Sequence, residues 1–83
     1  MHYIAVDFEW NQPLEGAQRI KIGEDEFLCG EIIQIGAVKA DENFRKVSEF
    51  SAFVRPVKYV KMNRRVESIT GITSEMTQNC ETF

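Results

Sequence analysis

The chain has 83 residues, of which 43% are hydrophobic and 28% charged, and its net charge at pH 7 is -3. This length allows one small domain that buries about 60% of its unfolded surface, and the composition excludes a disordered chain. The acidic balance gives no sign of a polyanion-binding surface, although a metal ion held by carboxylates would supply positive charge locally.

The sequence carries no targeting or membrane signal. No basic start precedes an apolar stretch, and no apolar run approaches the roughly 20 residues that a membrane span needs. Cys29 and Cys80 do not form a Cys-x-x-Cys pair, and His2 is the only histidine, which argues against a structural zinc site. We therefore expect a cytoplasmic protein with reduced thiols and no membrane partner.

The first predicted element is a strand over residues 2–10. Every second residue from Ile4 to Phe8 is apolar, so one face of this strand is hydrophobic and the other carries the acidic side chains. Asn, Pro and Gly in the following segment end the strand. Residues 19–30 then form either an irregular excursion or a small hairpin that turns at residues 23–25.

Two more strands follow. Residues 31–41 are an almost continuous apolar run, which is typical of a strand covered on both faces of its sheet. A polar turn at residues 41–43 leads into a segment with alternating apolar residues, which predicts the hairpin partner of the second strand, ending at Pro56. The three strands are therefore expected to form an antiparallel meander.

A short helix is predicted over residues 64–70. Asn63 suits its N-cap, and Gly71 suits the left-handed position that ends a helix. A further cap at Thr73 or Ser74 starts a second short helix. The predicted fold is thus α/β of the α+β kind, a three-stranded antiparallel meander followed by one or two short helices.

Asp7 and Glu9 are the candidate catalytic and metal-binding residues of the first strand. Residues two apart in a strand share a face, so these positions lie about 7 Å apart along the chain. Two like charges on one face are costly unless a cation lies between them, a proton is shared or water reaches both. Mg²⁺ and Mn²⁺ suit carboxylate oxygens, and a pair of such ions promotes phosphodiester cleavage. The alternative is a solvated pair at a sheet edge.

Four segments in the same order carry a family resemblance. They are "AVDFEW", "GEIIQIGAVKAD", "FSAFVRP" and "VESITGIT", and together they extend over almost the whole chain. The sequence resembles the amino-terminal part of the DEDD superfamily of 3'-5' exonucleases, whose fold is ribonuclease-H-like. The resemblance implies that residues 1–83 are the amino-terminal part of one such exonuclease domain.

The resemblance also implies a two-metal site of Mg²⁺ or Mn²⁺ at Asp7 and Glu9. Asp7 corresponds to the residue that bridges both metals, and Glu9 to the one that binds the ion holding the nucleophilic water. The implied reaction is hydrolysis of the terminal phosphodiester at a single-stranded 3' end of DNA or RNA, with the metals supplying most of the electrostatic stabilisation.

Nucleotide contacts are implied at two further positions. In relatives, a small or hydroxyl side chain after the glutamate contacts the terminal sugar, whereas here Trp10 would either stack on a base or pack at the strand end. Ile72 corresponds to an apolar residue near the terminal base, and a helix-stop contact explains it equally. Lys61, Arg64 and Arg65 either approach phosphates or form a solvated first helical turn.

The family's later half supplies two further aspartates and a histidine general base. Neither these aspartates nor this histidine is present here, and His2, the only histidine, precedes the first motif and cannot act as the base. We therefore expect the chain alone to be a poor nuclease or none. The family's first strand lies between the second strand and a later parallel strand, which makes it an edge in this chain. Exposed edges and apolar faces favour self-pairing, so we expect either a fragment of a longer enzyme or a homodimer through the first strand or the sheet face.

Three interpretations follow. The first is a segment of a metal-dependent 3'-5' exonuclease, and the second is a non-catalytic protein-interaction module with an exonuclease-like half-fold. The third is a small three-stranded sheet protein whose resemblance is accidental. Metal binding at Asp7 and Glu9 favours the first interpretation, whereas the second predicts metal indifference and a stable, specific oligomer.

Overall fold

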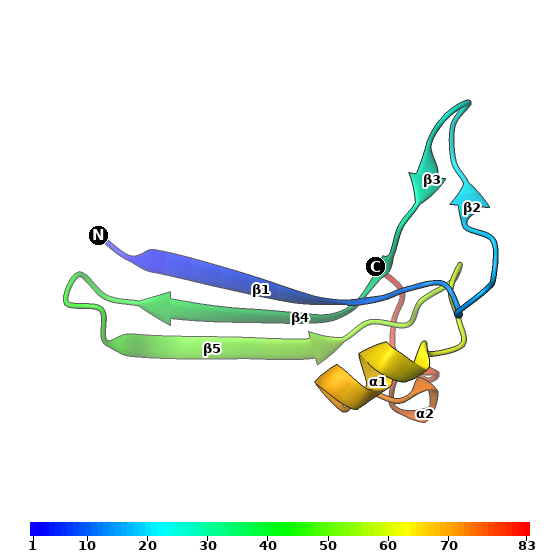
Figure 1. The fold of residues 1–83 in the computed structure, drawn as a ribbon. Helices are drawn as coiled ribbons and strands as arrows, with labels where there is room; N and C mark the ends of the chain where they lie inside the picture. Colours follow the sequence, from blue (N-terminus) through cyan, green and yellow to red (C-terminus); the bar gives the residue numbers. More distant parts are fainter.

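The computed structural model describes all 83 residues. The fold is a long sheet with a hairpin and two short helices near one of its ends (Figure 1). The elements in chain order are β1 (Tyr3–Asn11), β2 (Ile20–Lys21), β3 (Phe27–Leu28), β4 (Glu31–Ala40), β5 (Lys46–Phe53), α1 (Arg64–Thr70) and α2 (Ser74–Thr77). The predicted meander and helices are confirmed. Residues 19–30 contain the hairpin, because β2 and β3 pair in antiparallel fashion.

The main sheet has the strand order β1-β4-β5, and both of its strand pairs are antiparallel. β1 is therefore an edge strand, as the resemblance led us to expect. The register between β1 and β4 shifts at Glu9, where Gln34 is the partner and the preceding residue, Ile33, has none. This irregularity is a β-bulge, which bends a strand and increases its twist.

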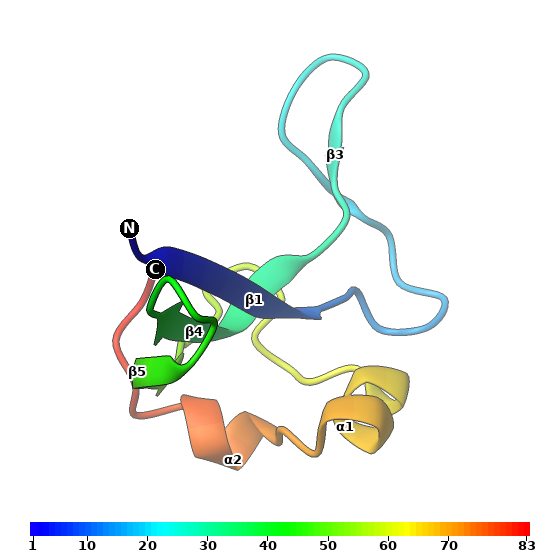
Figure 2. The ribbon, with the colours of Figure 1, turned by 90° about the vertical axis from the view of Figure 1, so that its left-hand side faces the viewer.

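The hydrophobic core lies at one end of the sheet, under the helices. Figure 2 shows α1 and α2 on the same side of the sheet, with the hairpin projecting away from it. The core consists of four buried residues, Ile33, Met62, Val66 and Ile72, with Phe53 packed against them. Phe53 is the cross-strand partner of Gln34, which in turn faces Glu9, so the helices cover the face of the sheet that bears Glu9.

The prediction that residues 31–41 are covered on both faces is wrong. Within β4 only Ile33 is buried, and the other residues are half-buried or exposed. The reason is that the helices lie near the start of β4 and leave the rest of the sheet open (Figure 1). The radius of gyration is accordingly 15.4 Å, against about 12 Å for a compact domain of this length.

Helix α1 begins and ends where the sequence predicts. The Asn63 side chain accepts hydrogen bonds from the backbone N–H groups of Arg65 and Val66, and Gly71 ends the helix in the left-handed region, at φ 76°. Thr73 caps α2 in the same way, through a bond from the Met76 N–H. Neither helix has the length or the apolar character that crossing a membrane requires.

Candidate metal and nucleic-acid site

Asp7 and Glu9 lie on the same face of β1 and have different cross-strand neighbours. Asp7 is opposite Gly36 of β4, which is itself opposite Ser51 of β5. Glu9 is opposite Gln34. Because alternate residues of a strand share a face, both carboxylates belong to the face that the helices partly cover. Asp7 is exposed and Glu9 is half-buried, so Glu9 lies nearer to the core.

A shallow hollow of about 310 Å³ lies beside Asp7. It exists because Gly36 has no side chain to fill the space opposite the aspartate. A Cβ added at Gly36 would meet only the Asp7 carbonyl oxygen, at 3.9 Å, which is ordinary van der Waals distance. Ser51 and Glu49 line the far side of the hollow. The surface next to Asp7 therefore has room for a small ion or a phosphate group.

Neither carboxylate is neutralised by a basic side chain. The two ion pairs of the structure join the amino terminus to Glu42 and Lys46 to Glu49. Asp7 and Glu9 therefore offer free oxygen ligands of the kind that hard divalent cations bind. No group of three or more acidic, histidine or cysteine side chains comes together in the structure. These two carboxylates fit such a cation as part of its ligand set.

The structure places Trp10 and Ile72, the two predicted nucleotide contacts, in different surroundings. Trp10 follows Glu9 in the strand and so lies on the opposite face, with its ring 6.2 Å from that of Phe8 between centroids. Ile72 is only 2% exposed and belongs to the core. Ile72 is therefore packed in the core, whereas Trp10 is 47% exposed on the face of β1 opposite the carboxylates.

Asn11, at the end of β1, is the residue whose importance the sequence analysis missed. It is completely buried, and its Nδ2 donates to the carbonyl oxygens of Tyr59 at 2.7 Å and Lys61 at 3.0 Å. Its Oδ1 accepts from the Asn63 N–H at 2.9 Å. An asparagine after a strand is equally typical of a turn, so the sequence held no separate signal. Asn11 thus ties the segment that leads into α1 to the end of β1.

Glu31 holds the same segment from another side. Its carboxylate accepts hydrogen bonds from the backbone N–H groups of Val57, Lys58 and Tyr59, at 2.8 to 3.2 Å. Bonds to an ionised acceptor are stronger than neutral ones, so this cluster is a firm anchor. Tyr59 in turn bonds both strands of the hairpin through its hydroxyl group. Glu31 therefore has a structural role.

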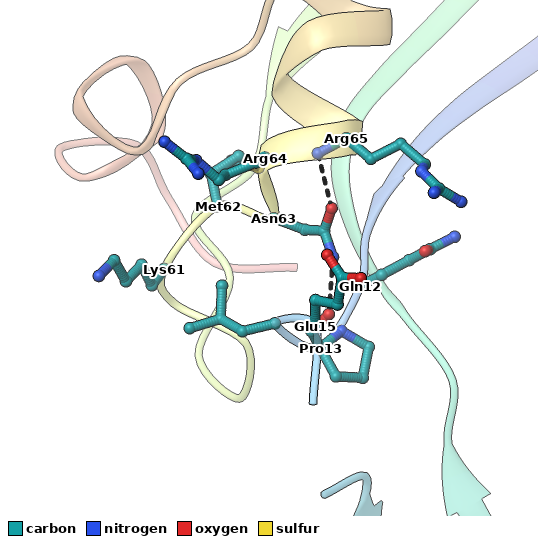
Figure 3. A pocket seen from close by; sticks show the side chains of 9 residues that line it. Gln12, Pro13, Glu15, Lys61, Met62, Asn63, Arg64 and Arg65 are labelled. Atoms are coloured by element: carbon teal, nitrogen blue, oxygen red, sulfur yellow. Dashed lines mark hydrogen bonds between the residues drawn. The ribbon is translucent and has the colours of Figure 1, made fainter. Parts of the chain in front are cut away.

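An open groove of about 740 Å³ lies between the segment after β1 and the start of α1 (Figure 3). Three cationic side chains line it, Lys61, Arg64 and Arg65. Glu15 is the only acidic residue in its lining. Asn63 joins the two walls, because its Nδ2 donates to the Pro13 carbonyl oxygen at 2.7 Å while its Oδ1 caps α1.

Comparison with known protein families identifies the class to which this fold and these residues belong. The family model described as exonuclease (RNase T) matches residues 29–83, which is more than half of the chain. The chain belongs to this exonuclease family, within the DEDD superfamily, and has the ribonuclease-H-like fold over the part that it covers. The predicted resemblance and fold class are confirmed, and an accidental resemblance is excluded.

Solved structures of 3'-exonucleases are similar to the chain along nearly its whole length. A full-length 3'-exonuclease has 24% identity and a TM-score of 0.77, covering 99% of this chain and 25% of the other. The nuclease domain of 3'hExo, a DEDDh family member bound to rAMP, has 26% identity and a TM-score of 0.76, covering 99% and 38%.

A third similar structure is a 3'-exonuclease described in the 3'-end-specific recognition of a histone mRNA stem-loop. It has 26% identity and a TM-score of 0.76, covering 99% of this chain and 33% of the other. Among curated protein sequences there is no match. The chain therefore spans between 25% and 38% of the length of these three structures.

Proposed function

We propose that residues 1–83 form the amino-terminal part of a metal-dependent 3'-5' exonuclease domain, in which Asp7 and Glu9 hold Mg²⁺ or Mn²⁺. The observation that supports this most is the pair of unneutralised carboxylates on one face of β1, of which Asp7 borders the hollow at Gly36. The proposed substrate is the single-stranded 3' end of a nucleic acid. RNA is favoured over DNA, because two of the similar structures concern a histone mRNA and rAMP.

The chain's own residues would contribute to the reaction only by holding the divalent ions and fixing their position. When bound, divalent ions supply charge stabilisation for the phosphodiester and an activated water. Asp7 and Glu9 would hold these ions on a sheet that Asn11 ties to α1, so the carboxylates keep a fixed spacing. Because no third acidic, histidine or cysteine side chain joins Asp7 and Glu9, we expect the isolated chain to release few nucleotides or none.

Titration calorimetry with Mn²⁺ tests the proposal. We expect saturable binding to the wild-type chain, and an affinity at least about tenfold lower, or 1.4 kcal/mol, in Asp7→Asn/Glu9→Gln, because the amides lose the charge that attracts the ion. The matched control is Glu24→Gln/Glu42→Gln, which removes two exposed carboxylates from turns of the hairpin and of the main sheet.

The control separates a specific site from general attraction to an acidic chain. Binding that falls equally in both double variants, or a wild type that takes up no Mn²⁺ in saturable fashion, would contradict the proposal. Release of nucleotides from single-stranded RNA should be measured in parallel. Substantial release by the wild type would contradict the expectation that these residues are insufficient alone.

A second candidate function is a protein-interaction module that forms a homodimer through the uncovered face of the sheet. On the face opposite the carboxylates, Ile4, Val6 and Phe50 are 68%, 52% and 59% exposed, and no helix covers them. β1 also has one free edge, whose backbone groups are able to pair with another strand. Face-to-face packing of two copies would bury the apolar side chains, whereas antiparallel pairing of two β1 strands would occupy the free edge and leave these side chains exposed.

Sedimentation velocity over a range of protein concentrations tests this candidate. We expect the wild type to shift towards a dimer as concentration rises, and Val6→Lys/Phe50→Lys to remain monomeric because buried lysines oppose association. Ile22→Lys/Val60→Lys adds the same charge at exposed apolar positions elsewhere and should still dimerise. A wild type that is monomeric throughout would rule out self-association.

A further inference from the structure

We propose that the groove between the segment after β1 and the start of α1 binds the sugar-phosphate backbone of a single-stranded nucleic acid. The strand would lie there just upstream of a 3' end held at Asp7 and Glu9, so this inference rests on the proposed function. Three features of the groove support this assignment, namely its charge, the arrangement of its side chains and its position along β1.

The charge of the groove opposes that of the whole chain. Lys61, Arg64 and Arg65 contribute three positive charges and Glu15 one negative charge, which leaves a net +2 on a chain of net -3. All three cationic residues are exposed, and neither of the two ion pairs in the structure includes them. Their charges are therefore free to attract an anion.

The arrangement of the cations favours an extended anion over a single small one. In Figure 3 the side chains of Arg64 and Arg65 extend in different directions from the start of α1, and Lys61 lies on the far side of Arg64 from Arg65. Such spacing suits successive phosphates of a strand, whereas one phosphate would need donors that converge. The N–H groups of Arg65 and Val66 already bond Asn63, so the side chains and not the helix end would make the contacts.

The lining of the groove favours a nucleic acid over an acidic peptide. Only two of its nine residues, Leu14 and Met62, are hydrophobic. Peptide recognition usually depends on apolar anchors in well-packed pockets, whereas backbone recognition depends on cations and polar side chains. The amides of Gln12 and Asn63 supply polar groups beside the cations.

The position of the groove connects it to the carboxylates. Gln12 lines the groove and follows Glu9 by three residues, which is about 10 Å along an extended chain. Asn11, between them, is buried and bonded to the backbone of Asn63, so the groove and the acidic face keep a fixed relation. A strand that ends at the carboxylates would therefore have its next phosphates within reach of the cations.

Fluorescence anisotropy with a labelled single-stranded RNA oligonucleotide, measured in EDTA over a range of salt concentrations, tests the groove without the metal site. We expect Lys61→Gln/Arg64→Gln/Arg65→Gln to weaken binding at least about tenfold and to reduce the slope of log K against log salt by about 2, since three phosphate contacts are lost. The matched control, Lys39→Gln/Arg45→Gln/Lys46→Gln, removes the same charge from the far end of the sheet and should bind nearly as well as the wild type.

Two outcomes would overturn the inference. In the first, the groove variant binds RNA as the wild type does, or the control variant loses as much. In the second, a poly-glutamate peptide displaces the RNA at equal charge concentration, which would assign the groove to an acidic peptide. Circular dichroism of each variant should show that the fold is retained.

Metal titration of the same proteins separates this inference from the proposed function. The groove variant should keep the wild-type affinity for Mn²⁺, and Asp7→Asn/Glu9→Gln should keep RNA binding in EDTA. If the groove variant binds RNA normally while Mn²⁺ binding depends on Asp7 and Glu9, only the groove assignment fails. If Mn²⁺ binding fails while the groove variant loses RNA, the metal proposal fails and the groove stands as a binding site.

Discussion

Asn11→Ala is expected to lower the free energy of unfolding by about 3 kcal/mol, because it removes three hydrogen bonds from a fully buried side chain. The substitution leaves the carbonyl oxygens of Tyr59 and Lys61 and the N–H of Asn63 without these partners, at about 1 kcal/mol each. Urea denaturation followed by circular dichroism measures the loss.

Gln12→Ala is the matched control for this prediction. Gln12 is the next residue, is exposed, and should change the free energy of unfolding by less than about 0.5 kcal/mol when truncated. Asn11→Asp adds a sharper comparison, since the carboxylate keeps the shape but has no N–H to donate to the two carbonyl groups. Equal urea midpoints for Asn11→Ala and Gln12→Ala would show that the Asn11 bonds do not stabilise the chain.

Ile33→Ala is expected to cost about 3 to 4 kcal/mol, within the usual range for truncating a fully buried aliphatic side chain. Ile33 is 0% exposed and is the only buried residue of β4, so it joins the sheet to Val66 of α1 and to Met62 and Ile72, which flank that helix. The core is small, so little neighbouring structure is available to collapse into the cavity. The measurement is again the free energy of unfolding in urea.

Two further variants calibrate the effect at Ile33. Ile33→Val should lose about 0.5 to 1.5 kcal/mol, because it removes a single methylene. Val38→Ala, in the same strand but 37% exposed, should lose less than Ile33→Ala. A loss at Val38 that equals or exceeds the loss at Ile33 would mean that the stabilising core does not lie at the helical end of the sheet.

The features that were predictable from sequence depend on residues that are close together in the chain. Asn63 and Gly71 mark the ends of α1 because a cap bonds N–H groups within its own first turn and a left-handed residue ends the last one. Asp7 and Glu9 share a face because side chains alternate along any strand. Periodicity and turn chemistry are local properties, and the resemblance to the exonucleases depends on the order of such local segments.

Burial and long-range partners were decided by the tertiary structure. Asn11 became a buried anchor because segments 48 to 52 residues away supply its hydrogen-bond partners. The apolar run of β4 predicted coverage on both faces, yet the helices reach only its start. Ile72 entered the core, and Lys61 joined Arg64 and Arg65 around one groove. A local pattern shows which side chains are able to be buried, but only the packing of distant segments determines which of them are covered.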